Sequence, residues 1–376
     1  MKNNFTIHRS ILKVLLGLVI IAIIGVVVFV CLQISGKNRL YSKSANKKPD
    51  LASVAITWED ELTEDGETDS NTESKQPILI VEEDSDNWEE GDLRYKGVHY
   101  RYNDEMLTFL FLGIDKDGTV KKAKNGIDGG QSDTIFLLAL NPKTKEASLI
   151  GVNRDTMTEI DVYMENGNYL TTITGHITLQ HGYGDGKELS CERSLAAVSK
   201  LFYNLPIHGY CSINYGAIPK INDAVGGVTL TLKEDVTNDG GKILYKKGQT
   251  VTLKGQKAVQ FLKARDCEEF GSAGKRTERQ KQYLLAYADA AKQAVKKDVT
   301  VIVKLFNTIS KYMVTDITVD EVSYFSTQVA DYHFDASHAY SVPGETVMGD
   351  KFEEFYVDEK GLYELILKVF YDVIDD

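Results

Sequence analysis

The feature that most constrains the fold of this chain is an uncharged apolar run at residues 14–34. As a helix, a run of this length can cross a bilayer core of about 30 Å. The apolar region of a cleaved signal peptide is usually only about 7–15 residues long, so the run favours an uncleaved anchor over a signal peptide. We predict a cytoplasmic tail at residues 1–13, a transmembrane helix at 14–34 and a large water-soluble remainder.

The basic residues around the apolar run do not decide its orientation. A simple count of them would place the large remainder inside the cell, but long C-terminal domains translocate despite such counts. The orientation therefore stays open on charge alone. The flanking residues are Lys2, Arg9 and Lys13 before the run, and Lys37, Arg39, Lys43, Lys47 and Lys48 after it.

The acidity of the chain is concentrated just after the apolar run. The formal net charge is −12, and residues 58–92 hold fifteen acidic side chains against the single Lys75. Like charges repel and keep such a segment extended and solvated. We predict an acidic linker over residues 35–100, acting as a spacer rather than a binding tail, and a domain over 101–376. This charge gives no reason to expect a nucleic-acid partner, which usually requires a basic patch.

Apolar patterning in the domain predicts a layered α/β fold. Continuous apolar runs at 108–114, 134–140 and 147–152 are typical of strands that are buried on both faces. A turn at 141–145 joins the second and third runs as a hairpin, so the sheet is at least partly antiparallel. Long helices between buried strands indicate a three-layer α/β/α domain with a mixed central sheet. Helical spacing predicts helices at 188–204, 215–225, 255–265, 276–295, 300–313, 318–332 and 358–374, and alternation predicts a strand at 228–232.

The four cysteines show no metal-ligand spacing. Cys31 lies in the apolar run, and the domain can form at most one disulfide among Cys191, Cys211 and Cys267. We expect these three to be small buried side chains.

Three charged residues follow or begin the predicted strands: Asp115, Asp133 and Arg154. Strand ends and the loops that leave them are common places for functional sites. Two carboxylates at one sheet end repel each other unless a cation lies between them, and Mg²⁺ binds one or two carboxylates together with phosphate oxygens. The alternative is that each acid caps a turn or a helix start.

A second group of charges is cationic and lies around the start of the helix predicted at 276–295. Arg276 and Gln280 are four residues apart in its first turns, where free N–H groups and the helix dipole favour an anion. The planar guanidinium of arginine suits phosphate oxygens. The alternative is a solvated face paired with Glu268, Glu269 and Glu278. The cations are Lys263, Arg265, Lys275, Arg276 and Arg279.

Several common catalytic patterns are absent from the sequence. It contains no Gly-x-Ser-x-Gly elbow, no His-Glu-x-x-His, no P-loop and no Gly-x-Gly-x-x-Gly. A serine hydrolase, a zinc protease and a nucleotidase therefore have no support.

Several separated segments occur together in an order and spacing that resembles the LytR-CpsA-Psr family. The resemblance covers about residues 104–374. The segments are 112–115 (Leu-Gly-Ile-Asp), 132–135 (Ser-Asp-Thr-Ile), 141–144 (Asn-Pro-Lys-Thr), 154–156 (Arg-Asp-Thr), 221–228, 253–258 with the Arg265, Arg276, Arg279 and Gln280 that follow, 342–345 and 356–358.

The resemblance implies an extracytoplasmic α/β/α domain held at the cell membrane by one N-terminal helix. Such proteins bind a polyprenyl-pyrophosphate lipid, with its tail in an apolar groove, and transfer the attached glycopolymer to peptidoglycan with the help of Mg²⁺. Carried over by motif, Asp115 and Asp133 would hold the metal, and Arg154, Arg265 and Arg276 would be catalytic. The diphosphate would be bound by Arg154, Lys263, Arg265, Arg276, Arg279 and Gln280.

Three positions depart from the family pattern. Gln131 stands where the family usually has arginine, Lys263 replaces the first arginine of an Arg-x-Arg pair, and Ala273 replaces an aspartate. Lysine is only a point-charge substitute for a bidentate arginine, and alanine cannot act as a base. A non-catalytic lipid-binding or scaffolding protein, and a lipid pyrophosphatase, therefore remain alternatives to the transferase.

Overall fold

The centre of the protein is a six-stranded mixed sheet. The computed structural model describes residues 27–51, 87–298, 300–328 and 331–374. Within the sheet, β3 pairs antiparallel with β4 and parallel with β8, and β14 pairs parallel with β5. The strand order is β13 (Met313–Thr315), β8 (Gly209–Asn214), β3 (Leu107–Ile114), β4 (Ser132–Asn141), β5 (Glu146–Val152) and β14 (Ala339–Ser341).

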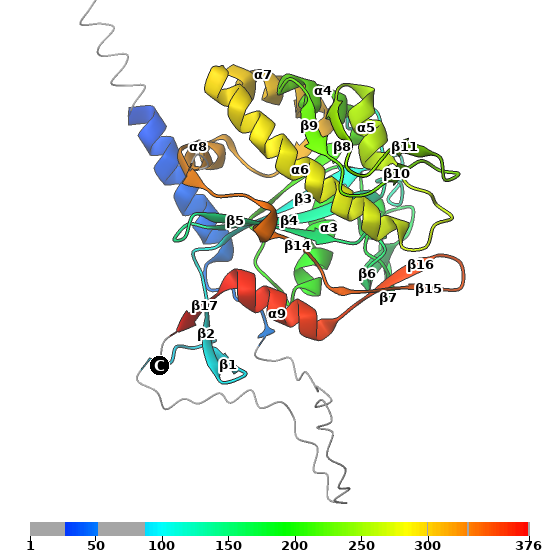
Figure 1. The fold of residues 1–376 in the computed structure, drawn as a ribbon. Coiled ribbons are helices and arrows are strands. Elements are labelled where there is room, and N and C mark those ends of the chain that lie inside the picture. The colour runs from blue at the N-terminus through cyan, green and yellow to red at the C-terminus, as the bar shows by residue number, and fades with distance from the viewer. Residues whose placement is uncertain (1–26, 52–86, 299, 329–330, 375–376) are drawn as a thin grey trace, which may run out of the picture.

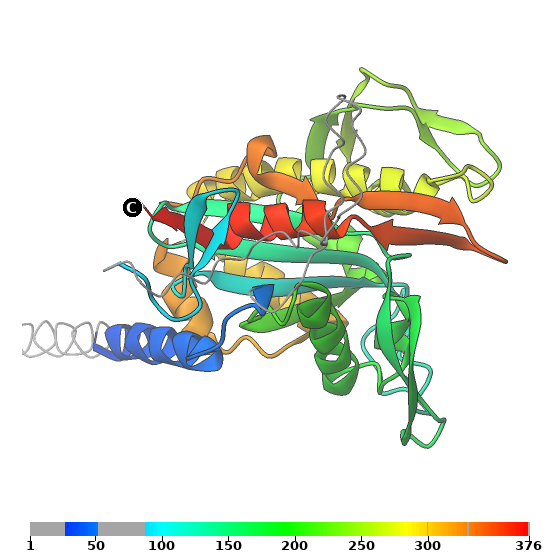
Figure 2. The ribbon, with the colours of Figure 1, turned by 90° about the horizontal axis from the view of Figure 1, so that it is seen from below.

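Helices lie on both faces of this sheet (Figure 1). One face carries α3 (Glu188–Leu201) and α9 (Glu359–Phe370), and the other carries α6 (Ser272–Lys297), α7 (Thr300–Ile309) and α8 (Val319–Gln328). Figure 2, turned by 90°, shows α9 in front of the strands and α3 below them. The mixed α/β fold and the mixed sheet expected from the sequence are confirmed.

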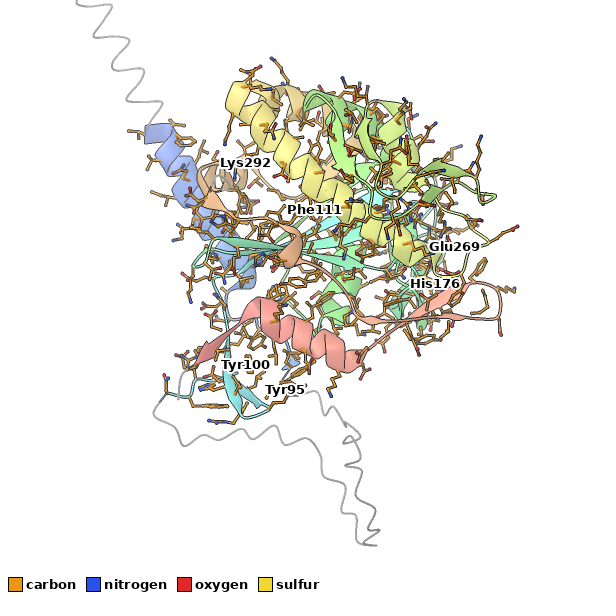
Figure 3. The ribbon with its side chains drawn as sticks, in the orientation of Figure 1. Tyr95, Tyr100, Phe111, His176, Glu269 and Lys292 are labelled. Carbon is orange, nitrogen blue, oxygen red and sulfur yellow. The ribbon has the colours of Figure 1, made fainter. Side chains whose placement is uncertain are left out.

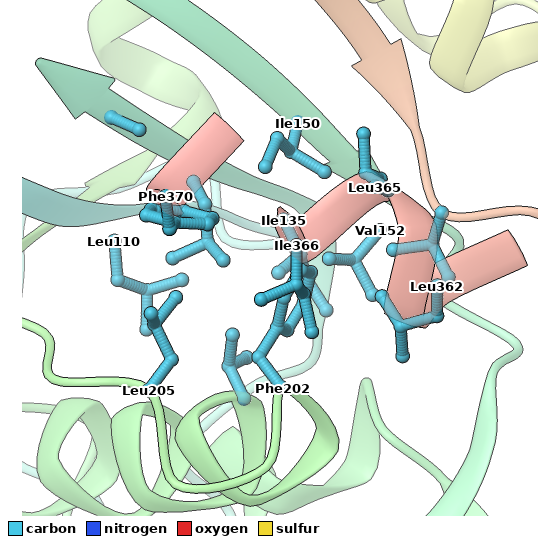
Figure 4. Packing of buried hydrophobic residues seen from close by; sticks show 14 of the residues in the cluster. Leu110, Ile135, Ile150, Val152, Phe202, Leu205, Leu362, Leu365, Ile366 and Phe370 are labelled. Carbon is cyan, nitrogen blue, oxygen red and sulfur yellow. The ribbon is translucent and has the colours of Figure 1, made fainter. Parts of the chain in front are cut away.

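The largest core cluster joins the sheet to α3 and α9 (Figure 4). Leu110, Ile135 and Ile150 of the sheet are at most 2 % exposed, and they pack with Phe202 next to α3 and Ile366 of α9. Burying each such side chain contributes about 1.5–3 kcal/mol, so this face is firmly tied to its two helices. The continuous apolar runs of the sequence arise because the opposite face of the same strands is also covered.

On that opposite face α6 comes close to the sheet at a glycine. A Cβ on Gly151 would lie 2.9 Å from the Thr277 methyl carbon, so a larger residue there would push α6 outward. Phe136 is buried beside this contact, whereas Phe111 and Leu138 on the two central strands are only half-buried. The cover over the middle of this face is therefore incomplete (Figure 3, Phe111).

Smaller elements surround the sheet. Two hairpins project from it, and a small unit of strands and helices packs on α6 around Val228 and Phe261. The hairpins are β6 (Met157–Tyr163) with β7 (Tyr169–His176), and β15 (Gly344–Met348) with β16 (Glu353–Val357). The small unit holds α4 (Ile218–Ala224), β9 (Val228–Thr231), β10 (Val236–Thr237), β11 (Ile243–Tyr245), β12 (Thr250–Leu253) and α5 (Gln256–Lys263). A separate three-stranded sheet holds β1 (Leu93–Tyr95), β2 (Val98–Tyr102) and β17 (Tyr371–Ile374). A short helix, α2, spans Leu179–Gly182.

Two local predictions need correction. The helix predicted at 358–374 ends at Phe370, because residues 371–374 pair with β2 as strand β17. Cys191 and Cys211 are buried as expected, but Cys267 is exposed in the loop before α6. All four cysteines are free, and burial raises the pKa of the Cys191 and Cys211 thiols to about 12.

The N-terminal part of the chain differs from the expected extended linker. Residues 27–44 are helical, and Leu40 is fully buried against Leu107 and Phe109 of the sheet. The start of the predicted linker is thus packed on the domain, while residues 52–86 lie outside the described part. Among the described helices, none is both long and apolar enough to cross a membrane; residues 14–26 of the apolar run were not among them.

Candidate active site

Asp133, the second residue of β4, lies at the centre of a cluster of polar side chains. One oxygen of its carboxylate accepts a hydrogen bond from Arg154. The other lies 3.6 Å from an Nη of Arg276 and accepts a hydrogen bond of 3.4 Å from the Tyr215 hydroxyl. Arg276 also donates to the backbone carbonyl of Asp133 at 3.3 Å. The structure therefore brings together residues from β4, α6 and the loop that follows β5.

Arg154 is held in place by further partners. Its Nε donates to Asp155 Oδ1 at 3.1 Å, and its Nη2 donates to Gln131 Oε1 at 2.6 Å. The backbone N–H of Gln131 donates in turn to Asp115 Oδ1 at 2.9 Å. Gln131, a departure from the family pattern, thus orients Arg154 by accepting a hydrogen bond, which an arginine at this position could not do.

Arg276 is buried with part of its hydrogen-bonding capacity unused. It is 4 % exposed, and its Nε has no hydrogen-bond partner among the described residues. Burial, and then repulsion from Arg265, lower the pKa of Arg276, although Tyr215 and Asp155 oppose this. Burial also lowers the pKa of Arg154, and repulsion from Arg276 and Arg265 lowers it further. The three arginines therefore repel one another in a partly desolvated site.

Arg265 and Lys263 flank this cluster. Arg265 is half-buried and makes no hydrogen bond or ion pair with any residue that the structure describes, although its charge acts on Arg154 and Arg276. Lys263 is exposed, and its ammonium lies 4.9 Å from the centre of the Tyr215 ring. The Arg265 side chain can therefore bind an anion without first breaking a contact.

Arg279 and Gln280 are engaged elsewhere. Arg279 donates to the backbone carbonyls of Phe261 and Ala264, and it lies 3.5 Å from a carboxylate oxygen of Glu234. Gln280 donates to the Leu262 carbonyl at 3.3 Å. These carbonyls belong to the last turn of α5 and to Ala264, the residue that follows it, where the helix itself provides no donors. Two residues predicted to bind phosphate thus support the C-terminal end of α5.

The two aspartates predicted as metal ligands differ in surroundings. Asp133 already contacts two arginines, and Asp115 is exposed with one oxygen accepting from Gln131. In the described part of the chain, no group of three or more His, Cys, Asp or Glu side chains converges on one point. A magnesium ion often uses only one or two carboxylates, so this donor set fits Mg²⁺ if phosphate oxygens complete its coordination.

Sequence reasoning assigned no role to Tyr215, Asp155 and His176. Tyr215 begins the short 3₁₀ turn after β8, and His176 Nδ1 lies 3.8 Å from Asp155 Oδ1 at the end of β7. Asp155 directly follows Arg154 in one of the family-like segments, which was a usable signal. His176 begins a segment, 176–184, that is a weaker match to the family pattern, whereas nothing in the sequence points to Tyr215, which only the fold brings to Asp133.

Solved structures share this fold. TagV of B. subtilis matches with a TM-score of 0.52 and 22 % identity, over 70 % of this chain and 94 % of that one. Protein gbs0355 from Streptococcus agalactiae matches with a TM-score of 0.55 and 18 % identity, over 70 % and 86 % of the two chains. TagT bound to LI-WTA matches with a TM-score of 0.51 and 20 % identity, over 70 % and 89 %.

Curated relatives carry the name polyisoprenyl-teichoic acid–peptidoglycan teichoic acid transferase TagU. The protein of Oceanobacillus iheyensis is 29 % identical over 240 residues, which is 63 % of this chain and 67 % of the relative. That of Bacillus cereus is 30 % identical over 222 residues, or 58 % and 62 %. This chain thus matches about two thirds or less of the length of these relatives. The sequence model of the LytR_cpsA_psr family matches residues 65–368, which is most of the chain. The chain therefore belongs to the LytR_cpsA_psr family.

Proposed function

We propose that this protein is a transferase that moves a glycopolymer from a polyprenyl-pyrophosphate carrier onto peptidoglycan, at the outer face of the cell membrane. Family membership and the transferase name of its relatives support this reaction class. The apolar run at 14–34 supports a single membrane anchor.

The observation that carries the proposal is the surplus of positive charge around Asp133. Arg154 and Arg276 both contact Asp133, and the charge of Arg265 acts on both of them. Within the described residues, the carboxylates that form ion pairs with Arg154 and Arg276 are those of Asp133 and Asp155. A diphosphate supplies negative charge to these arginines, and it accepts hydrogen bonds from the half-buried Arg265, which makes no hydrogen bond or ion pair with any described residue. Such charge-assisted contacts strengthen as charge develops on a leaving phosphate.

The half-covered sheet face offers a place for the lipid tail. Phe111, Leu138 and Ile213 lie on neighbouring strands of that face and are half-buried beneath the α6 side of the molecule. Apolar side chains exposed in the middle of a sheet favour an apolar ligand. We place the tail along this face, with the diphosphate at the Asp133 end.

In the proposed reaction, a hydroxyl of peptidoglycan attacks the phosphorus that bears the glycopolymer. A new P–O bond forms to that hydroxyl, the bridging P–O bond breaks, and polyprenyl phosphate leaves with the electron pair and takes up the proton that the hydroxyl loses. Arg154, Arg265 and Arg276 orient the diphosphate and stabilise the leaving phosphate. Mg²⁺, held by Asp115 and Asp133 with substrate oxygens, would add further neutralising charge.

A reconstituted transfer assay tests this function. We would incubate the full chain in vesicles with a synthetic polyprenyl-diphosphate disaccharide, a peptidoglycan oligomer and Mg²⁺, and detect the joined product by mass spectrometry. Arg154→Ala should lower the rate by about 10²-fold or more. Arg193→Ala is the control, because Arg193 stacks on Tyr163 and donates to the Tyr183 carbonyl, outside the Asp133 cluster.

The substitution at Ala273 favours one alternative, a binding or scaffolding protein. Ala273 is buried near the start of α6 and has no titratable group. This alternative predicts lipid binding without product, and activity in Gln131→Arg/Ala273→Asp. Product formation by the parent chain, lost in Arg154→Ala, rejects it, and product that forms without any glycan acceptor would instead indicate a pyrophosphatase.

A further inference from the structure

The end of the domain where residue 27 lies carries exposed apolar side chains near several lysines in the sequence. In Figure 1 this end, at the upper left, holds the N-terminal helix, α7 and the C-terminal end of α6. α7 has the sequence Thr-Val-Ile-Val-Lys-Leu-Phe-Asn-Thr-Ile, which is unusually apolar for a helix at a surface. Phe306 of α7 is 52 % exposed, and Val319 of α8 is 72 % exposed.

Lysines are frequent at the adjoining end of α6. Residues 289–304 contain four lysines and two aspartates, and Lys292, Lys296 and Lys297 are exposed in the last turns of α6 (Figure 3, Lys292). The fourth, Lys304 of α7, pairs with Asp298 at 3.0 Å. An apolar helix with lysines around it is typical of segments that lie in the interface of an anionic bilayer.

The N-terminal helix holds this end of the domain in a fixed orientation. A Cβ on Gly36 would lie 2.1 Å from the Asp320 carbonyl oxygen, so the helix can touch the start of α8 only because residue 36 is glycine. One turn later Leu40 is fully buried, and the Lys43 ammonium lies 2.9 Å from the buried carboxylate of Glu321. The helix is therefore docked on α8, and its first described residue lies at this end of the domain.

We propose that α7, the start of α8 and the last turns of α6 form a membrane-docking surface that binds the interface of an anionic phospholipid bilayer. The surface comprises Lys292, Lys296, Lys297, Phe306, Val319 and Val322. The proposal rests on the membrane anchor of the proposed function and goes beyond it, because the domain then lies on the bilayer instead of being held away from it by an acidic spacer.

Two features favour a bilayer over a second copy of the chain. The lysine cluster would repel its own copy across a symmetric interface, whereas it complements anionic headgroups. The apolar run at 14–26 precedes residue 27 at this same end, so an anchor would bring the surface to the membrane. The surface also lies at the far end of α6 from Arg276; α6 has 26 residues and is about 39 Å long. A lipid tail along the sheet could then lead from the bilayer toward the Asp133 cluster.

Fluorescence quenching by brominated lipids tests the docking surface. We would reconstitute the full chain in vesicles of phosphatidylglycerol and phosphatidylcholine, with and without bromine on the acyl chains, using Phe306→Trp. Phe352→Trp is the matched control, because Phe352 is 70 % exposed on the β15–β16 hairpin at the other end of the molecule. Emission is read as a difference from the parent chain.

We expect about twofold quenching of Phe306→Trp and none of Phe352→Trp, because an interfacial helix buries its apolar face about 5–10 Å into the bilayer. Changing Lys292, Lys296 and Lys297 to glutamate should abolish the quenching in phosphatidylglycerol vesicles. The same change at Lys242, Lys246 and Lys247, which are exposed near β11, should leave it intact.

Flotation of the parent chain separates the two levels of the proposal. If the chain floats with the vesicles but Phe306→Trp is not quenched, or is quenched no more than Phe352→Trp, the docking surface is refuted and the anchor stands. If quenching is absent and Phe306→Trp emission shifts with protein concentration, the surface binds a second copy instead. If the chain does not float, both the anchor and the docking surface are refuted. Loss of transfer activity alone refutes neither.

Discussion

Arg265 and Arg279 should have opposite effects on stability and activity, although sequence alone assigns both to the diphosphate. Arg279 is 5 % exposed and donates hydrogen bonds to two backbone carbonyls at the end of α5. Arg265 has no hydrogen bond or ion pair within the described residues. Replacing each by methionine removes the donors and keeps an unbranched apolar side chain. The pair of variants therefore separates a structural arginine from a substrate-binding one.

The expected magnitudes follow from these contacts. Hydrogen bonds from a charged group contribute about 1.5–3 kcal/mol each, and Arg279→Met removes two of them, so it should lower the free energy of unfolding by about 4 kcal/mol. Arg265→Met should change it by less than about 0.5 kcal/mol. Removing Arg265 also relieves its repulsion of Arg154 and Arg276, which favours a small gain in stability. Transfer by Arg265→Met should fall by about 10²-fold or more.

Urea unfolding followed by far-ultraviolet circular dichroism, on the full chain in detergent, measures the stabilities, and the transfer assay measures activity. The reasoning is refuted if Arg279→Met unfolds within 1 kcal/mol of the parent, about the weight of a single ordinary hydrogen bond, while its transfer falls as far as that of Arg265→Met. Arg279 would then bind the diphosphate, as the sequence predicts. A large loss of stability in Arg265→Met would equally contradict the assignment.

Three further changes test other parts of the structure. Leu40→Ala should cost about 2–5 kcal/mol, because it leaves a cavity under the N-terminal helix; an unchanged melting temperature would mean that this helix is not docked. Asp133→Asn removes the carboxylate that pairs with the buried Arg276 and leaves Arg154 with Asp155 alone, so it should cost about 3–5 kcal/mol, partly recovered on adding pyrophosphate; a more stable variant would contradict the assigned geometry. Burial lowers the pKa of His208 to about 4, so below pH 6.5 the unfolded state takes up a proton that the folded state does not, and stability should fall by about 3 kcal/mol between pH 6.5 and 4. In His208→Gln the melting temperature should depend less on pH between 6.5 and 4. An unchanged slope of melting temperature against pH would refute the assignment to His208.

Much of the sheet and of the cluster around Asp133 could be predicted from local pattern. The apolar runs at 108–114, 134–140 and 147–152 became β3, β4 and β5, because residues buried on both faces of a strand must be continuously apolar. The sequence points to Asp133 and Arg154 because charged residues next to buried strands lie where those strands begin or end. The two do meet there, joined by a hydrogen bond.

The roles of neighbouring helix residues could not be predicted in this way. Arg276 and Gln280 are four residues apart and so lie on one face of α6, yet Arg276 turns to Asp133 while Gln280 turns to the Leu262 carbonyl. Spacing tells which side of a helix a residue occupies, but not which partner another element brings to that side. Here the partner is the open end of α5, whose carbonyls required donors.

The docking of the N-terminal helix was likewise decided only by the tertiary structure. The sequence by itself determined an apolar run, an acidic segment, the alternation of strands and helices, and the family to which the segments belong. It did not reveal that Lys43 pairs with Glu321, because no local pattern links residues that far apart in the chain. Long-range contacts of this kind depend on how the sheet and its helices pack, and that packing turns the start of a predicted spacer into part of the domain.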